Sequence, residues 1–167
     1  MSRALAIVRW SALSRDADET AAIGETLGRT APDGALILLE GPLGAGKTTL
    51  AQGVGAGCGV REPVTSPTYN LILRYSGDRT FTHVDLYRLA DASELETLDL
   101  DAILGGGGVT CVEWPEILGD RHDPPWARVR IERVAGRAGG RSIRCELAGE
   151  NWEPAIAALA GRGEPEG

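Results

Sequence analysis

Residues 41–48 read Gly-Pro-Leu-Gly-Ala-Gly-Lys-Thr and satisfy the pattern G-x-x-x-x-G-K-[ST] at every fixed position. In this pattern the glycines let the backbone wrap a phosphate with its N–H groups directed inward. The helix that begins at the lysine directs the positive end of its dipole toward the same anion. The sequence therefore predicts a P-loop, in which Lys47 contacts the β- and γ-phosphates of a nucleotide and Thr48 binds Mg²⁺.

The segments on either side of this loop have the form that a P-loop requires. Ala35–Leu39 is a continuous apolar run bounded by turn residues, which is typical of a parallel strand buried on both faces. A helix is predicted from Lys47 to about Gly57, so the motif lies between a strand and a helix. The alternative, a chance glycine-rich turn, does not explain this context. We expect the nucleotide to be bound by Gly44, Ala45, Gly46, Lys47, Thr48 and Thr49.

The lysine of the motif is the only lysine in the chain. The chain has 17 basic residues, and all the others are arginine. A compact ammonium and a planar guanidinium are not interchangeable at a shaped site. The single lysine at position 47 therefore supports a specific role for its ammonium.

Composition sets the class of protein. The chain has 167 residues, 43% of them hydrophobic and 25% charged, which is typical of one globular domain, expected over residues 1–161 with a flexible tail at 162–167. A net charge of -7 disfavours nonspecific binding of nucleic acid by the whole surface. The longest apolar run, Ala35–Leu39, is too short to span a membrane, and no signal peptide is evident. Three dispersed cysteines without a CxxC pattern indicate a cytoplasmic protein without a zinc site.

Two carboxylates follow apolar strands and are candidates for metal chemistry. Residues 81–84 lead to Asp85, and residues 109–112 lead to Glu113. In open α/β sheets, ligands lie at the carboxyl ends of the strands. We therefore predict that Asp85 and Glu113 hold the metal or its water and, with Lys47, support catalysis. Solvated strand ends are the simpler alternative for each.

The loop between the P-loop helix and Asp85 carries three hydroxyl groups, from Thr65, Ser66 and Thr68. In a nucleotide-dependent switch, such a hydroxyl senses the γ-phosphate through Mg²⁺. A solvated turn is the alternative. His83 alternates with Asp85 on one strand face, where a histidine is more often packed and hydrogen-bonded than catalytic.

The order of the remaining elements indicates the fold class. Strands mixed with helices after a strand–loop–helix unit predict an α/β fold: a three-layer α/β/α sandwich of the P-loop NTPase type, with a mostly parallel central sheet and an antiparallel C-terminal hairpin. The expected strands are Ala4–Trp10 at an edge, Tyr69–Tyr75, Phe81–Leu86, Val109–Glu113 and the hairpin Ala127–Val134 with Arg141–Leu147. The expected helices run from Ser14 or Asp16 to about Thr30, around Ser93–Leu100, and through Trp152, Ile156 and Leu159.

Several motifs of the chain occur in the order and spacing of the bacterial TsaE (YjeE) ATPases. These are residues 44–49 (GAGKTT), 66–69 (SPTY), 83–88 (HVDLYR) and 112–115 (VEWP), with Glu94-Leu95-Glu96 and Leu98 also similar. The resemblance extends over about residues 13–115 and more loosely over the hairpin. The chain differs from the usual family pattern at Pro42 and Glu116, neither of which is a fixed motif position.

This resemblance implies a cytoplasmic Mg²⁺-dependent ATPase that acts with TsaB and TsaD to form threonylcarbamoyladenosine at position 37 of tRNAs reading codons that begin with A. It implies that the chain hydrolyses ATP without transferring the threonylcarbamoyl group, and that tRNA is an indirect partner, reached through the complex. By the same resemblance, Thr48 and Glu113 hold Mg²⁺, Asp85 is needed for hydrolysis, and Trp114 lies near the nucleotide.

Arg141 is a further candidate for nucleotide binding. It follows Gly139-Gly140, which allow close backbone approach, and family members carry a Gly-Arg pair at this place. A triphosphate of charge about -4 is stabilised by a second cation beside the lysine. The alternative is a solvated arginine in a turn.

Three other classes of protein share part of this pattern. A small GTPase needs a second lysine in an N-K-x-D element, which this chain lacks. A shikimate-kinase-like small-molecule kinase would use Asp99, Asp101 and the glycine run 105–108, but here that run precedes a strand instead of following one. A nucleotide-gated binding module, in which hydrolysis resets a complex, overlaps the TsaE-like function.

Overall fold

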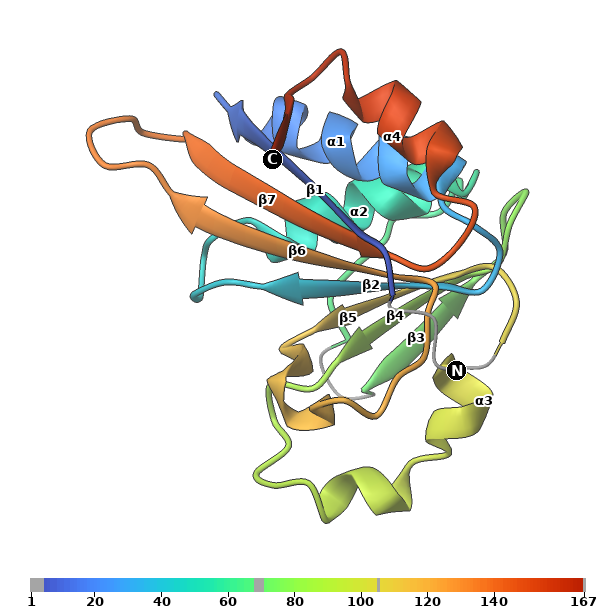
Figure 1. The fold of residues 1–167 in the computed structure, drawn as a ribbon. Coiled ribbons are helices and arrows are strands. Elements are labelled where there is room, and N and C mark those ends of the chain that lie inside the picture. Colours follow the sequence, from blue (N-terminus) through green and yellow to red (C-terminus); the bar gives the residue numbers. More distant parts are fainter. Residues whose placement is uncertain (1–4, 68–70, 105, 167) are drawn as a thin grey trace.

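The computed structural model describes residues 5–67, 71–104 and 106–166 of the chain. In these residues the strands form one sheet that is covered by helices on both faces (Figure 1). The strands are β1 (Ile7–Ser14), β2 (Ala35–Glu40), β3 (Ile72–Tyr75), β4 (Phe81–Asp85), β5 (Val109–Glu113), β6 (Trp126–Arg133), β7 (Arg141–Ala148) and β8 (Glu164–Glu166). The helices are α1 (Ala17–Thr30), α2 (Lys47–Gly57), α3 (Leu100–Leu104) and α4 (Glu153–Leu159), with 3-10 helices η1 (Glu94–Thr97) and η2 (Pro115–Leu118).

The sheet has a parallel centre and antiparallel flanks. Its strand order is β3-β4-β5-β2-β6-β7-β1-β8. Strands β4, β5, β2 and β6 run parallel to their neighbours within this group, whereas β3, β7, β1 and β8 pair antiparallel. The carboxyl ends of the parallel strands therefore meet at one edge, where the loop after β2 also begins. This confirms the predicted α/β fold with its antiparallel hairpin.

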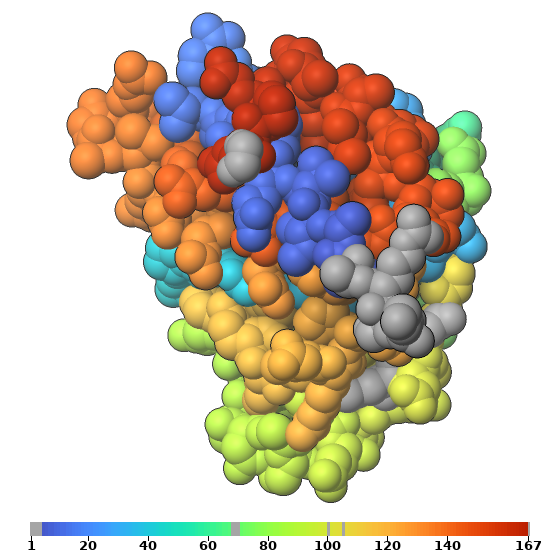
Figure 2. Space-filling view, in the orientation of Figure 1, coloured from blue at the N-terminus to red at the C-terminus, as the bar shows by residue number. Residues whose placement is uncertain are grey.

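Strand β2 is buried on both faces, as its apolar run predicts. Ile37 and Leu39 belong to the core under α1, α2 and α4, whereas Leu36 and Leu38 belong to the core under η1, α3 and η2. The segment of η1 and the chain around it form the lower end of the molecule (Figure 2). The three layers hold β2, and hence the loop that follows it, in a fixed position.

Helices α1 and α2 approach each other at backbone distance. A Cβ added to Gly28 would lie 2.1 Å from the Val54 carbonyl oxygen, and one added to Gly53 would lie 2.1 Å from that of Ala21. Only glycine allows this contact, because both obstructing atoms are backbone atoms. At these glycines the P-loop helix α2 therefore lies against α1 with no intervening side chain.

The N-terminal strand differs from its prediction. It spans Ile7–Ser14, whereas the sequence predicts Ala4–Trp10, of which position 4 lies outside the described residues. The strand lies between β7 and β8 rather than at an edge. Asp16 is the N-cap of α1, since its Oδ1 accepts from the Glu19 N–H at 2.9 Å. Ser14 instead ends β1. The predicted strand ended at Trp10 because the pairing of residues 11–14 with β7 is a contact between distant parts of the chain.

The sequence predicts a flexible tail at 162–167, but Glu164–Glu166 forms strand β8 on β1, and position 167 lies outside the described residues. The indole N–H of Trp10 donates to the Leu159 carbonyl at 3.0 Å, which brings the end of α4 beside β1. The chain that follows then covers the free backbone edge of β1, a stabilising arrangement for an edge strand.

The acidic segment predicted as a helix over Ser93–Leu100 is divided in two. Residues 94–97 form η1, Leu98 is extended, and α3 starts at Leu100. The Asp99 carboxylate accepts from the Ala102 N–H at 3.1 Å and so begins a new helix. Of the strand predicted at Tyr69–Tyr75, Ile72–Tyr75 is observed as β3, and positions 69 and 70 lie outside the described residues. Among the helices described here, none combines the length and apolarity needed to cross a membrane.

Candidate nucleotide-binding site

The P-loop joins β2 to α2, as predicted. Gly46 is the N-cap of α2 with φ of 111°, and Gly44 has φ of 74°. These left-handed conformations are strained for residues with a side chain but accessible to glycine. They turn the backbone so that α2 starts at Lys47, with its unpaired N–H groups at the loop.

Lys47 is held inside the loop and is only 5% exposed. Its Nζ donates to the carbonyl oxygens of Gly41 at 2.5 Å and Pro42 at 3.1 Å. The same Nζ lies 3.8 Å from the centre of the Trp114 ring, a cation–π contact. Burial lowers the pKa of the Lys47 ammonium, and the nearby Glu113 carboxylate opposes that shift.

Thr48 connects the P-loop to Glu113 and to the loop that carries Ser66. Its hydroxyl donates to Glu113 Oε1 at 3.1 Å and lies 3.0 Å from the Ser66 hydroxyl. Glu113, at the end of β5, is 3% exposed and lies opposite Asp85 of β4 in the parallel register. The structure thus brings four predicted site residues together: Thr48, Ser66, Asp85 and Glu113.

Asp85 is half-buried beside this group. Its Oδ1 accepts from the Tyr87 N–H at 3.0 Å. Burial raises the pKa of the Asp85 carboxyl, against the effect of that hydrogen bond, and the Glu113 carboxylate raises it further. Asp85 is therefore not an ordinary solvated strand end.

The oxygen ligands at this edge suit Mg²⁺. Hydroxyl and carboxylate oxygens are its preferred protein ligands, and it usually retains several waters and binds phosphate oxygens as well. No group of three or more His, Cys, Asp and Glu side chains in the described ranges could hold a metal ion without other ligands. The three oxygen-bearing side chains here are those of Thr48, Glu113 and Asp85. They fit a cation that also binds a nucleotide, rather than a metal ion held by protein ligands alone.

Arg141 lies against the P-loop, although it is 96 residues distant from Ala45 in the chain. Its Nε donates to the Ala45 carbonyl at 2.5 Å, and its Nη2 donates to the Gly44 carbonyl at 3.4 Å. Arg133, directly opposite Arg141 in the hairpin, donates to the same Gly44 carbonyl at 3.3 Å. The turn of this hairpin and the P-loop lie at the same end of the sheet (Figure 1). The sequence alone did not identify Arg133 as a P-loop contact. The signal that could have identified it is its pairing with Arg141 across the hairpin.

Trp114 follows Glu113 with a left-handed backbone, at φ of 57°. This conformation directs its ring over Lys47 and against Tyr87, 4.9 Å between ring centres. A hollow of about 420 Å³ results, lined by Leu43, Gly44, Ala45, Gly46, Lys47, Thr48, Thr49, Ser66, Asp85, Tyr87, Glu113, Trp114 and Arg141.

The three predicted switch hydroxyls differ in their positions. Ser66 lines the hollow beside Thr48. The Thr65 side chain is exposed, and its backbone N–H donates to the Tyr75 hydroxyl at 3.2 Å. Thr68 lies outside the described residues.

Comparison with known proteins agrees with this geometry. The family described as "Threonylcarbamoyl adenosine biosynthesis protein TsaE" matches residues 14–143. The chain belongs to the TsaE family. The resemblance seen in the sequence is thereby confirmed, and the chain is a member of a family of tRNA threonylcarbamoyladenosine biosynthesis proteins.

Individual TsaE relatives cover most of the chain. The protein named "tRNA threonylcarbamoyladenosine biosynthesis protein TsaE" from Streptomyces coelicolor is 40% identical over 146 residues, which are 83% of this chain and 98% of the relative. The protein of that name from Bacillus subtilis is 37% identical over 139 residues, 81% of this chain and 84% of the relative. The crystal structure of Bacillus subtilis YdiB superposes with a TM-score of 0.71 at 26% identity, covering 96% of this chain and 98% of YdiB.

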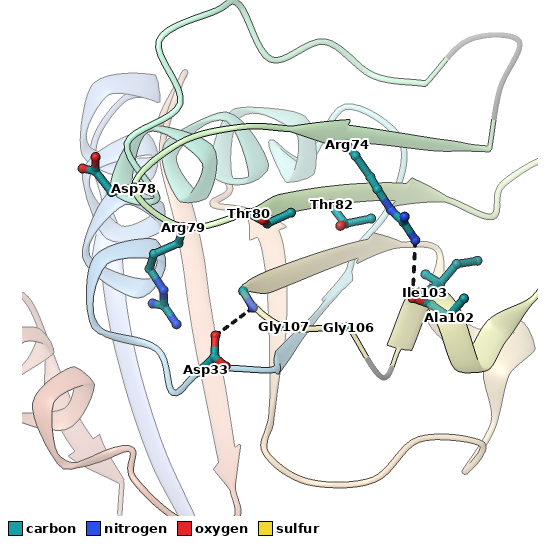
Figure 3. A pocket seen from close by; sticks show the side chains of 11 residues that line it. Asp33, Arg74, Asp78, Arg79, Thr80, Thr82, Ala102, Ile103, Gly106 and Gly107 are labelled. Carbon is teal, nitrogen blue, oxygen red and sulfur yellow. Dashed lines mark hydrogen bonds between the residues drawn. The ribbon is translucent and has the colours of Figure 1, made fainter.

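A second hollow of this TsaE-family chain (Figure 3) lies beside the amino ends of β2 and β5. The P-loop lies at the other end of these strands. It measures about 480 Å³ and is bordered by Gly106 and Gly107, which precede β5, and by Asp33, which precedes β2. The Asp33 carboxylate accepts from the Gly108 N–H at 2.7 Å. Asp101 lines a neighbouring hollow with Gly106. Asp101, Gly106 and Gly107, which the kinase alternative would use, therefore lie near the amino ends of the strands, away from the P-loop. Position 105 of the glycine run lies outside the described residues.

Proposed function

We propose that this chain is a Mg²⁺-dependent ATPase that acts in the cytoplasm with TsaB and TsaD in forming threonylcarbamoyladenosine at position 37 of tRNAs reading codons that begin with A. The observation that carries the proposal is the meeting of Lys47, Thr48, Asp85 and Glu113 at one edge of the sheet, around a P-loop. Membership in the TsaE family supports the pathway. In this function the chain hydrolyses ATP to reset or drive the complex, does not itself transfer the threonylcarbamoyl group, and meets tRNA through its partners.

The P-loop binds and orients the triphosphate. The backbone of residues 44–49 surrounds the phosphates, and Lys47 exchanges its carbonyl partners for the β- and γ-phosphate oxygens. When bound, Mg²⁺ neutralises charge on those oxygens. Thr48 and Glu113 hold it, with Asp85 next to them.

Asp85 has a separate task from Glu113. Its carboxylate is half-buried and one oxygen is held by the Tyr87 N–H. In the proposed reaction it orients the attacking water and receives a hydrogen bond from it, so its effect is on hydrolysis more than on binding. Trp114 covers Lys47 and limits the access of bulk water to the phosphate end of the hollow.

The nucleotide contact proposed for Arg141 is supported by its place on the P-loop carbonyls. The loop that carries Thr65 and Ser66 is proposed as the switch, since Ser66 contacts the Mg²⁺-binding hydroxyl of Thr48. Slower amide exchange in this loop with an ATP analogue than with ADP would support a switch, and equal exchange would make it a connector.

The deciding experiment is reconstitution with TsaB, TsaD and tRNA. Phosphate release and modified tRNA are followed over many turnovers, and phosphate release is also measured with the chain alone and with shikimate-like acceptors. We expect sustained tRNA modification only when the chain and ATP are both present. Phosphorylation of a small acceptor, or modification that continues without the chain, would overturn the proposal.

A further inference from the structure

His83 is a fully buried histidine next to the candidate cation site. It occupies the middle of β4 with 0% exposure, and its Nε2 lies 2.7 Å from Glu113 Oε2. The other oxygen of the same carboxylate, Oε1, accepts from the Thr48 hydroxyl. The two carboxylate oxygens of Glu113 thus have different partners. Oε2 contacts His83 inside the sheet, and Oε1 accepts from Thr48 at the start of α2.

The polar contacts of His83 point to a role directed at Glu113. Its Nδ1 is buried and makes no hydrogen bond within the described part of the chain. A carboxylate only accepts hydrogen bonds, so the shared hydrogen lies on His83 Nε2 whenever Glu113 is ionised. Burying an imidazole with one unsatisfied nitrogen costs free energy that an apolar residue would avoid. The bond to Glu113 is the feature that offsets this cost.

The imidazole ring cannot easily turn away from Glu113. It stacks on Phe81, 6.1 Å between ring centres at 28°, and Phe81 in turn stacks on Tyr75 at 5.9 Å. On the sheet, His83 is paired with Cys111 of β5 and Leu73 of β3. The donor is therefore fixed by packing before any ligand binds, which is the condition for a preorganised site.

We propose that His83 is a positioning residue: by holding Oε2 of Glu113, it keeps Oε1 directed at Thr48 and the cation site. A glutamate side chain has three rotatable bonds, and a fixed partner for one oxygen restricts the position of the other. Partners of this kind around a metal ligand typically change metal affinity by about 10–100-fold. This inference rests on the proposed function, because it assigns the cation to Glu113 and Thr48.

The test compares two substitutions of similar size. His83→Leu removes the donor and keeps the site apolar, whereas His83→Gln retains an N–H donor at a similar distance from the backbone. The readout is the dissociation constant of Mn²⁺, measured by electron paramagnetic resonance, with the protein saturated with a slowly hydrolysed ATP analogue. Thermal unfolding and binding of the analogue without metal are measured alongside.

We expect His83→Leu to weaken Mn²⁺ binding about tenfold or more, with little change in metal-free nucleotide binding, and His83→Gln to restore most of the loss. In a Glu113→Gln background, His83→Leu should add almost nothing, because the two residues act through one contact. If His83→Leu does not fold, His83→Asn replaces it, since the shorter amide cannot reach Glu113 in the same way and should also lose metal affinity.

Unchanged Mn²⁺ affinity in the variant without the donor would overturn the positioning role, and so would equal losses in the leucine and glutamine variants. Either result would leave the proposed ATPase intact, because it concerns His83 alone. Failure of the unsubstituted protein to bind Mn²⁺ with the analogue would instead overturn the ATPase proposal and this inference together.

Discussion

Replacing Lys47 by arginine keeps the charge but changes its shape. Lys47 is 5% exposed as a residue. Its ammonium is enclosed by the Gly41 and Pro42 carbonyls and the Trp114 ring, at 2.5, 3.1 and 3.8 Å. The larger, planar guanidinium does not fit this space without displacing the loop, and overpacking of this kind costs about 1–3 kcal/mol. The charge would then be misplaced relative to the phosphates.

The expected effect follows from the contacts that Lys47 would make. Hydrogen bonds to charged groups contribute about 1.5–3 kcal/mol each, so loss of two phosphate contacts corresponds to about 3–6 kcal/mol. At 1.4 kcal/mol per factor of ten, Lys47→Ala should reduce kcat/KM by about 10²–10⁴-fold. Lys47→Arg should fail to a similar degree.

The assay is steady-state phosphate release, with tRNA modification by the reconstituted complex as a second readout. Arg137→Lys, in the exposed hairpin turn, is a matched control because it makes the reverse exchange away from the P-loop. It should behave as the natural protein does. Near-normal turnover of Lys47→Arg would refute the argument that the site requires an ammonium.

Three other expectations follow from the structure. Glu113→Ala and Asp85→Ala should reduce the rate of hydrolysis far more than the affinity for a slowly hydrolysed ATP analogue, because the loop backbone supplies much of the phosphate binding; parallel losses in calorimetric titration would contradict these roles. Arg141→Ala should raise the ATP dissociation constant several-fold and Arg137→Ala much less, and equal small effects would contradict a nucleotide contact of Arg141. Gly53→Ala should lower the free energy of unfolding by about 1–3 kcal/mol, although alanine is the better helix former, and an increase in the denaturation midpoint would disprove the close α1–α2 contact.

Local sequence determined the parts of this protein whose signal lies within a few consecutive residues. The pattern at residues 41–48, the apolar run before it and the helix after it specify the P-loop, because glycine conformations and a helix start depend on neighbouring residues only. Asp85 and Glu113 were identified for a similar reason, since each directly follows an apolar strand. The motifs also sufficed to indicate the TsaE family.

Tertiary structure decided which of these residues meet. The bond between His83 and Glu113 joins positions 30 residues apart, and it exists because β4 and β5 pair in parallel with Asp85 opposite Glu113. Pairing of β8 with β1 likewise depends on where α4 ends. Strand register is set by the burial of whole faces of a sheet and by the connections between strands, so a short stretch of sequence does not encode it. For this reason the sequence predicted a packed, hydrogen-bonded histidine without naming its partner, and only the folded sheet made that partner the candidate metal ligand Glu113.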